Sequence, residues 1–279
     1  MQQKAPGQET YPGGVIEQRA LSTAAGGTAL TTTAALVVIP DGVNALALIP
    51  RNFVTGVVAQ VALNPYLLVL MTTDNLVTLT DYSRAAQDGA AGTVVTLSSL
   101  DTLANGDFLL VGSHLPFRGV DVDMTANVNG TASVLTAKYR KTDDTWATLS
   151  ATDGTAAAGA TFGQDGQVTW TVPTDWAKKT LREINSPAPA LSLPNIDEPL
   201  YWTRWEVSAA LDASATAQAM LALNRSTAYA EIPAGITQSM GVVKGPGGVA
   251  CVEAKMDAGT GNLIVNAAVR RGSTSGVSL

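Results

Sequence analysis

The sequence predicts an all-β fold of two antiparallel β-sandwich or jelly-roll-like modules, with an extended N-terminal arm and a C-terminal β-hairpin segment. Between residues 84 and 232, runs of alternating apolar and polar residues are separated by turn residues, as in strands that bury one face. β-Branched residues dominate residues 15–83, where helical periodicity with capping residues is not evident. Tight β-connections require a positive φ, and the pairs that supply it are Asp88-Gly89, Asn105-Gly106, Asn129-Gly130, Asp153-Gly154 and Asp165-Gly166.

Four segments are predicted along the chain. Residues 1–14 are rich in proline and glycine among polar residues and are predicted to form an extended arm held by a neighbouring subunit. Residues 15–83 hold short apolar runs bounded by turn residues, which predict a small β-sandwich or β-barrel module. Residues 84–232 form the larger β-sandwich, and residues 233–279 form the C-terminal segment.

The C-terminal segment contains two predicted strands, at 249–253 and 262–269, which read as a hairpin across 257–261. A hairpin of this size does not fold alone. It is therefore expected to complete the sheet of another module or to pack on a neighbouring copy.

Alternation within the larger module assigns side chains to faces. In the strand 201–207, one set is predicted to face inward, namely Tyr201, Trp205 and Val207. The other set is predicted to face outward, namely Trp202, Arg204 and Glu206, and Trp202 is expected to be exposed. Trp170 is expected to lie inside, and residues 209–223 are a candidate short helix, although their alanine and threonine composition does not fix that assignment.

A proline-rich insertion, residues 185–198, separates two predicted strands. Loops of this length in a compact domain are usually functional or form an interface. Together with the N-terminal arm and the exposed tryptophan, this insertion supplies the predicted interface residues, which are Tyr11, Pro12, Val15, Pro187, Pro189, Pro194 and Trp202.

Composition favours a protein that packs against other polypeptides. Charged residues make up 14% of the chain and apolar residues 46%, against about 25% charged residues in ordinary soluble proteins. Weakly charged strand faces rich in threonine and alanine suit a surface covered by neighbouring copies. A β-rich secreted protein with small side chains has the same composition and is the alternative.

Charge distribution and hydropathy argue against nucleic-acid and membrane partners. The formal net charge is −6, and no run of basic residues is longer than a pair such as Lys178-Lys179 or Arg270-Arg271, whereas nucleic-acid binding needs a clustered basic face. The most apolar segment, residues 57–71, is interrupted by polar residues and proline, and the N-terminal residues lack a signal-peptide pattern. The expected site of synthesis is therefore the cytoplasm, from which the protein leaves, if at all, inside a particle.

Residue types needed for catalysis are scarce, so no enzymatic activity, cofactor or metal is predicted. His114 is the only histidine and Cys251 the only cysteine, so a triad or a histidine metal cluster would depend on a single loop residue. Residues 245–250 match a loose dinucleotide pattern, but Pro246 interrupts it and a predicted strand follows it, so it is interpreted as a turn.

Three further patterns bear on glycoside cleavage, glycan binding and metal binding. Glu206 lies beside Arg204 and Trp202, as a carboxylate in a sugar cleft does, but no second carboxylate partner stands out. An exposed tryptophan can stack on sugars, so glycan binding through Trp202 is kept as an alternative. Several aspartates are candidates for a calcium site, although their spacing fits no EF-hand loop and solvated turns are expected; they are Asp121, Asp123, Asp143, Asp144 and Asp153.

The run of residues 164–176, followed by Tyr201-Trp202-Thr203-Arg204 and Val207-Ser208, resembles a β-sandwich module that recurs in structural proteins of tailed bacteriophages. The turns at 143–146 and 152–155 resemble that module too, and the resemblance covers residues 105–212. It implies a location in the virion, either as a head decoration or cement protein or as a tail or baseplate component. The insertion 185–198 departs from the pattern because it separates the two tryptophan motifs widely.

The sequence and the resemblance together lead to one expected function. The chain is expected to be a non-enzymatic virion protein that decorates or cements the capsid, with major capsid or other virion proteins as partners and with self-association into a homo-oligomer, a trimer being favoured. The alternatives are a tail, baseplate or fibre component and a carbohydrate-binding receptor module.

Overall fold

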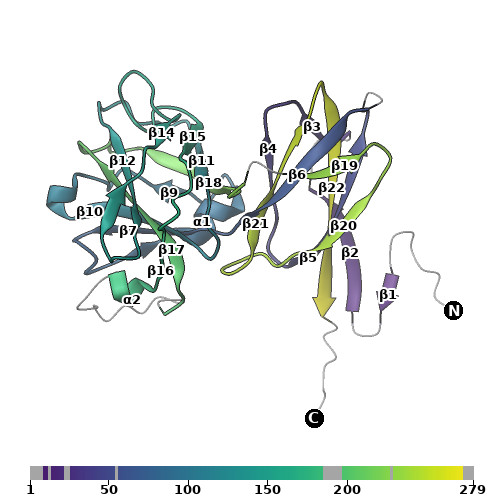
Figure 1. Ribbon diagram of the computed structural model, residues 1–279, viewed down its shortest axis with the longest axis horizontal. Coiled ribbons are helices and arrows are strands. Elements are labelled where there is room, and N and C mark those ends of the chain that lie inside the picture. The colour runs from purple at the N-terminus through teal and green to yellow at the C-terminus, as the bar shows by residue number, and fades with distance from the viewer. Residues whose placement is uncertain are drawn as a thin grey trace, which may run out of the picture. The chain divides into compact units, whose positions relative to one another are not determined.

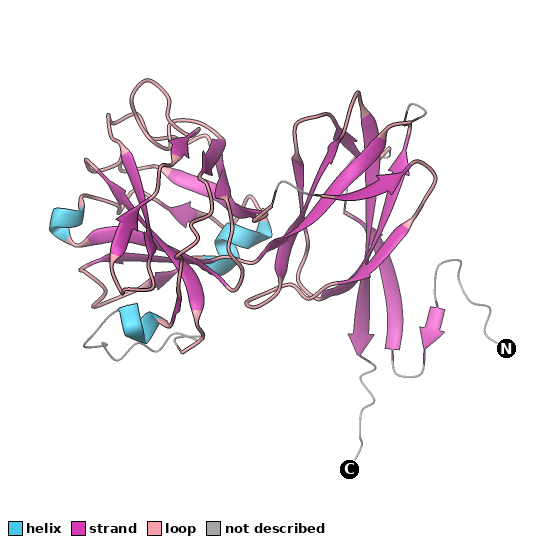
Figure 2. Ribbon diagram, in the orientation of Figure 1, coloured by secondary structure: helices cyan, strands magenta, loops and turns pink. Residues whose placement is uncertain are grey.

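The computed structural model describes residues 9–11, 14–21, 26–53, 56–184, 197–226 and 229–272. The all-β prediction is confirmed, because strands dominate the chain and helices are few and short (Figures 1 and 2). The helices in the described ranges are α1 (Ser83–Asp88), α2 (Leu181–Ile184) and the 3-10 turn Leu103–Asn105.

The described strands form two β-sandwiches, each a compact unit of its own. One unit is built from residues 1–63 and 228–279 and is named here the terminal sandwich; the other is built from residues 64–227 and is named the insert sandwich. The insert sandwich therefore interrupts the sequence of the terminal sandwich. These limits differ from the predicted module boundaries at 83/84 and 232/233.

The terminal sandwich packs a sheet of six described strands against a sheet of four. The order in the six-stranded sheet is β1-β2-β22-β5-β20, with β3 on β22. The order in the four-stranded sheet is β19-β6-β21-β4, and the pairings of β19 with β6, β21 with β4 and β22 with β5 are antiparallel. The strand bounds in the six-stranded sheet are β1 Glu9–Tyr11, β2 Gly14–Ala20, β3 Thr28–Leu30, β5 Val43–Arg51, β20 Gln238–Gly241 and β22 Gly261–Gly272. Those in the four-stranded sheet are β4 Ala35–Val38, β6 Val58–Pro65, β19 Ala230–Pro233 and β21 Val249–Met256.

Alternating apolar residues on these strands fill the core of the terminal sandwich. On β5, Leu46 and Leu48 point inward, and on β22, Leu263 and Val265 do the same. Each of these side chains is almost fully removed from solvent. Burial of that extent contributes about 1.5–3 kcal/mol for each large aliphatic side chain, so this core holds together strands from both ends of the sequence.

The predicted C-terminal strands exist, but they do not form a hairpin. β21 pairs with β4 in the four-stranded sheet, whereas β22 pairs with β2, β3 and β5 in the six-stranded sheet. The turn after Met256 therefore carries the chain from one layer of the sandwich to the other. Both strands of this segment therefore join sheets whose other members include β2, β3 and β5 in one layer and β4 and β6 in the other.

The insert sandwich packs a sheet of seven described strands against a sheet of five. The first has the order β13-β12-β17-β10-β7-β8, with β16 on β17, and the second has the order β14-β15-β11-β18-β9. The strand bounds in the first sheet are β7 Leu68–Thr73, β8 Thr80–Asp81, β10 Asp107–Ser113, β12 Leu135–Arg140, β13 Trp146–Thr148, β16 Lys178–Lys179 and β17 Leu200–Val207. Those in the second are β9 Val95–Thr96, β11 Gly119–Met124, β14 Thr152–Asp153, β15 Gly166–Thr169 and β18 Thr216–Leu223.

Aromatic side chains fill the space between the two sheets of the insert sandwich. Trp170 and Trp205 face inward as predicted, and their ring centroids lie 6.4 Å apart in an edge-to-face arrangement. Phe117 contacts both Trp170 and Trp176 at 5.4 and 5.2 Å. The helix proposed for residues 209–223 is wrong, because β18 occupies Thr216–Leu223 and pairs with β11.

A buried amide ties together the loops at one end of the insert sandwich. Asn129 is 1% exposed, and its Nδ2 donates to the carbonyl of Thr161, the carbonyl of Thr131 and Oγ of Ser133. Its Oδ1 accepts hydrogen bonds from the backbone N–H groups of Thr131 and Asp212. Three loops far apart in the sequence therefore depend on one side chain.

Candidate functional site

The outer face of the seven-stranded sheet carries a group of charged and aromatic side chains that contact one another. The antiparallel register sets Lys138 opposite Arg204 and Arg140 opposite Trp146, so these side chains share one face. Glu206 lies two residues beyond Arg204 and shares that face. This group of five residues is named here the charged ladder.

The two arginine side chains of the charged ladder are held in place by stacking on aromatic rings. The guanidinium carbon of Arg204 lies 5.0 Å from the ring centroid of Trp146 and 5.4 Å from that of Phe108. The guanidinium carbon of Arg140 lies 5.5 Å from the ring centroid of Trp146. Guanidinium groups stack on aromatic faces through the ring quadrupole, so Trp146 fixes the position of both arginines.

Glu206 is the counter-ion of this group. Its Oε2 lies 2.9 Å from Nζ of Lys138, and its Oε1 lies 2.6 Å from a terminal nitrogen of Arg204. The Glu206 side chain is 10% exposed. Both carboxylate oxygens therefore neutralise neighbouring cations, an arrangement that stabilises the sheet face rather than presenting the carboxylate to a sugar.

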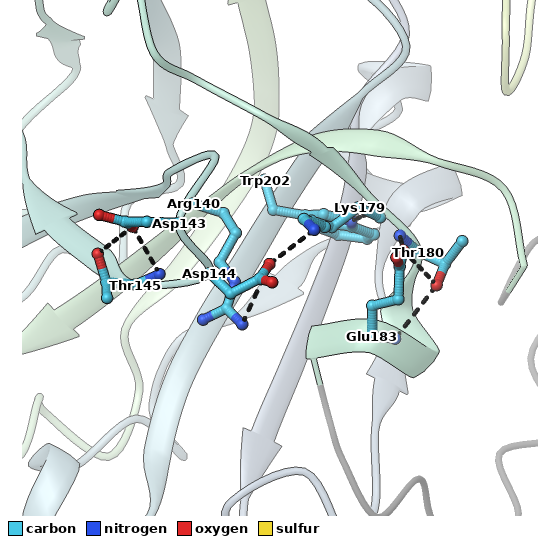
Figure 3. Close-up of polar contacts among 8 residues, drawn as sticks. All are labelled: Arg140, Asp143, Asp144, Thr145, Lys179, Thr180, Glu183 and Trp202. Carbon is cyan, nitrogen blue, oxygen red and sulfur yellow. Dashed lines mark hydrogen bonds and ion pairs between the residues drawn. The ribbon is translucent and has the colours of Figure 1, made fainter.

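Polar contacts around a turn and a short helix border the charged ladder (Figure 3). Asp144, in the turn between β12 and β13, lies 2.7 Å from Nζ of Lys179 and 4.0 Å from Arg140. Helix α2 begins with a capping box, because Thr180 Oγ1 accepts from the N–H of Glu183 while Glu183 Oε2 accepts from the N–H of Thr180. This reciprocal pair explains how so short a helix forms, and it positions α2 beside β17.

Asp143 is the carboxylate with the largest pKa change in this region. The hydroxyl and backbone N–H of Thr145 donate to it, and Lys141 adds an ion pair, so its pKa falls from the ordinary value of 3.8 to about 2. Lys179 lowers the pKa of Asp144 in the same way, through a hydrogen bond. Both aspartates therefore act as charged turn residues.

We expect an NMR titration of the Asp143 carboxyl carbon to give a midpoint near pH 2. Because the folded-state pKa lies below the unfolded value, the resulting stability is present above about pH 3.8 and is lost as the pH falls toward 2. Thr145→Val should raise the pKa of Asp143 and leave that of Asp144 unchanged. An Asp143 midpoint that does not respond to Thr145→Val would contradict the assigned cause.

The prediction that Trp202 is exposed is wrong. Its side chain is 1% exposed, its Nε1 donates to the carbonyl of Lys179, and its ring lies over Gly112, where an added Cβ would come within 2.5 Å of the ring atoms. A second apolar cluster covers this face of the sheet; its buried members are Leu68, Leu70, Leu76, Phe108, Leu110, Leu181, Leu200 and Trp202. Strand β17 is therefore buried on both faces, and Trp202 offers no stacking platform.

The other predicted interface residues lie in or next to the N-terminal arm and in the proline-rich insertion. Tyr11 belongs to β1 and Val15 to β2, and these two strands pair antiparallel. The remaining four lie outside the described residues; they are Pro12, Pro187, Pro189 and Pro194.

His114 and Cys251 lie in different units of the chain. His114 is half-buried in the loop after β10, and its Nδ1 is buried without a hydrogen-bond partner among the described residues. Burial lowers the pKa of His114 and nearby Lys178 lowers it further, while Glu198 opposes them. Cys251 is fully buried on β21, as expected for a small core residue.

The predicted candidates for a calcium site are spread over separate turns and strands. Asp121 accepts from Gln167, and Asp153 accepts from Thr155. Within the described ranges, no three His, Cys, Asp or Glu side chains come close enough together to hold a metal ion. No helix in the described part of the chain has the length and apolar character needed to cross a membrane.

A shallow pocket of about 250 Å³ opens on the insert sandwich, with Pro116, Pro173, Tyr201 and Arg225 in its wall. Pockets that enclose drug-sized ligands usually occupy about 300–1,000 Å³. This hollow suits a single side chain better than a substrate.

Comparisons with known proteins do not identify a family. No protein-family model matches the chain, and no curated protein is significantly similar to it. The residues themselves therefore carry the functional argument.

Proposed function

We propose that this chain is a non-enzymatic structural protein of a tailed-phage virion, and that it decorates and cements the capsid as a homo-oligomer. The resemblance over residues 105–212 supports the virion assignment. The observation that carries the proposal is a surface with few charges built on two β-sandwiches: 14% of residues are charged, and several large apolar side chains are exposed. These exposed residues are Val77, Leu115, Val128, Val134, Ile236 and Val243.

Cementing needs many modest contacts, because repeated copies convert weak binding into avidity. A surface with few charges loses little solvation when another polypeptide covers it. Within the charged ladder, Glu206 pairs with Lys138 and Arg204, so part of the charge on this sheet face is neutralised within the fold. A trimer remains the favoured oligomer, with major capsid proteins as the partners.

Purified particles test the proposal. Mass spectrometry with copy counting should find the chain at the high copy number of a capsid protein. A low copy number would favour a tail, baseplate or fibre component instead, and absence from particles would end the virion proposal. The carbohydrate-binding alternative loses its main support, because its predicted platform, Trp202, is 1% exposed.

Deleting residues 1–14 is expected to release the protein from particles without unfolding it. The described part of this segment is β1, a short strand at the edge of its sheet, and its loss leaves the core of the terminal sandwich in place. Circular dichroism checks the fold, and sedimentation with particles checks binding. If the truncated protein still binds particles at full occupancy, the arm does not contribute to particle binding.

A further inference from the structure

Strand β20 is an open edge of the six-stranded sheet. One side pairs with β5, and no described strand pairs with the other side. The N–H of Val242 donates to the carbonyl of Asn44, toward β5. Because backbone groups alternate in direction along an antiparallel strand, Ser239 and Gly241 direct their N–H and C=O groups away from β5.

The free part of this edge is short and well defined. Beyond Gly241, the carbonyl of Val243 accepts the N–H of Val249 of the same chain at 2.8 Å. At the other end, the side chain of Gln238 donates to the carbonyl of Ser239 at 3.2 Å, a bond that an incoming strand can replace. Ser239 and Gly241 therefore carry the outward-facing backbone groups of β20, with which no strand in the described part of the chain pairs.

The other described edge strands carry features that discourage pairing. β19 contains Glu231 and ends at Pro233, and charges and prolines are common protection for sheet edges. β8, β9, β14 and β16 have two residues each, and β1, β3 and β13 have three. β4 has four uncharged residues, but none of them is exposed. β20 is uncharged, lacks proline and exposes three of its four residues.

The open residues of β20 complement themselves. In an antiparallel pair related by a two-fold axis at Met240, Ser239 lies opposite Gly241 of the second copy, and Gly241 lies opposite its Ser239. Both residues direct their backbone groups outward, so the pair forms two hydrogen-bonded sites around a central non-hydrogen-bonded pair of Met240 residues. With a net charge of −6 on each chain, the absence of charge on β20 avoids repulsion where the copies meet.

We propose that β20 is a self-association edge that pairs antiparallel with β20 of a second copy, centred on Met240. The contact makes one continuous sheet from two terminal sandwiches, as in other interactions that add a strand to a sheet edge. This proposal goes beyond the proposed function and rests on it in one respect, namely that the partner is another copy of the chain. The β20 contact would act together with the other surfaces that hold the oligomer together. A contact of this size is weak alone and gains strength from repetition.

Disulfide trapping of the full-length chain tests the register. Met240→Cys places two cysteines directly opposite each other at a non-hydrogen-bonded site, where Cβ atoms lie about 4.5–5.5 Å apart. Ser239→Cys is the matched control, because position 239 is more exposed but faces position 241 of the partner. We expect Met240→Cys to form interchain disulfides about tenfold faster than Ser239→Cys, while the buried Cys251 stays reduced.

A second pair of variants tests the backbone bonds. Ser239→Pro removes an N–H that points away from β5, so the sheet keeps its own bonds, while Ser239→Ala keeps that N–H. In analytical ultracentrifugation at about 1 mM chain, a concentration suited to weak association, the wild type and Ser239→Ala should self-associate more than Ser239→Pro. Circular dichroism confirms that both variants fold.

Equal trapping rates at positions 239 and 240, or equal association of the proline and alanine variants, would overturn the β20 contact. A monomeric wild type would do the same and would leave the edge to a different protein. A monomeric wild type would also count against the homo-oligomer of the proposed function, whereas the virion assignment depends on copy number in particles and is tested separately. Conversely, a chain absent from particles could still pair through β20.

Discussion

Replacing Trp202 by alanine is expected to reduce the free energy of unfolding of the insert sandwich by about 3–5 kcal/mol, the usual cost of truncating a buried tryptophan. The ring is 1% exposed and packs over Gly112 in a cluster with Phe108 and Leu181. The substitution also leaves the carbonyl of Lys179 without its indole donor. A cavity and a lost hydrogen bond therefore act together.

Urea unfolding followed by tryptophan fluorescence measures this effect. All five tryptophans lie between residues 146 and 205, so the signal reports the insert sandwich alone. Trp146→Ala is the comparison, because Trp146 is only partly buried and its main role is to stack on Arg140 and Arg204; its cost should be about 1–2 kcal/mol. If Trp202→Ala costs less than Trp146→Ala, the ring is not buried as described.

Replacing Asn129 by alanine is expected to reduce the free energy of unfolding by about 3 kcal/mol. The buried groups around it lose the side-chain amide with which they form hydrogen bonds. The side chain makes five hydrogen bonds to loops that include Thr131, Thr161 and Asp212. Asn129→Asp should also destabilise, because the carboxylate cannot donate to the carbonyls of Thr131 and Thr161.

Asn127→Ala is the matched control for this prediction, because Asn127 is exposed in the same loop. Surface substitutions of this kind usually change stability by about 0.5 kcal/mol or less. The same urea experiment compares the three variants. Equal stabilities of Asn127→Ala and Asn129→Ala would show that the loops do not depend on the buried amide.

Local sequence patterns predicted much of the fold, because apolar and polar residues alternate with a period of two along a strand that buries one face. That period correctly assigned Trp170 and Trp205 to the core and separated the two faces of residues 201–207. It could not show what covers the second face, since the covering residues Leu76 and Leu181 lie far from Trp202 in the sequence. An outward-facing side chain was therefore mistaken for an exposed one.

Connections between strands were harder to predict than the strands. A short turn between β21 and β22 is compatible with a hairpin and equally with a connection between the two layers of the sandwich. The two possibilities are distinguished only by the pairing of β21 with β4 and of β22 with β5. The alanine-rich segment ending at Leu223 has the composition of a helix, but pairing with β11 decides its structure. Tertiary context overrides weak local propensity in such segments.

The candidate site was predicted only in part. Arg204 and Glu206 were placed on one face, but their contacts with Lys138 and Trp146 depend on the register of β12 against β17 and β13. A sequence gives no direct measure of that register. The open edge at β20 was not predicted either, because it depends on which strand lies at the end of the sheet.

The interrupted sequence of the terminal sandwich has a consequence for how the chain is made. When residue 227 leaves the ribosome, the insert sandwich already has all of its described strands, whereas β5 and β6 still lack β22 and β21. Domains generally fold as units during synthesis, so the insert can fold while the earlier strands wait for the last to be translated. A nascent chain stalled in this interval presents unpaired apolar strands, and this is the stage at which chaperone binding matters most.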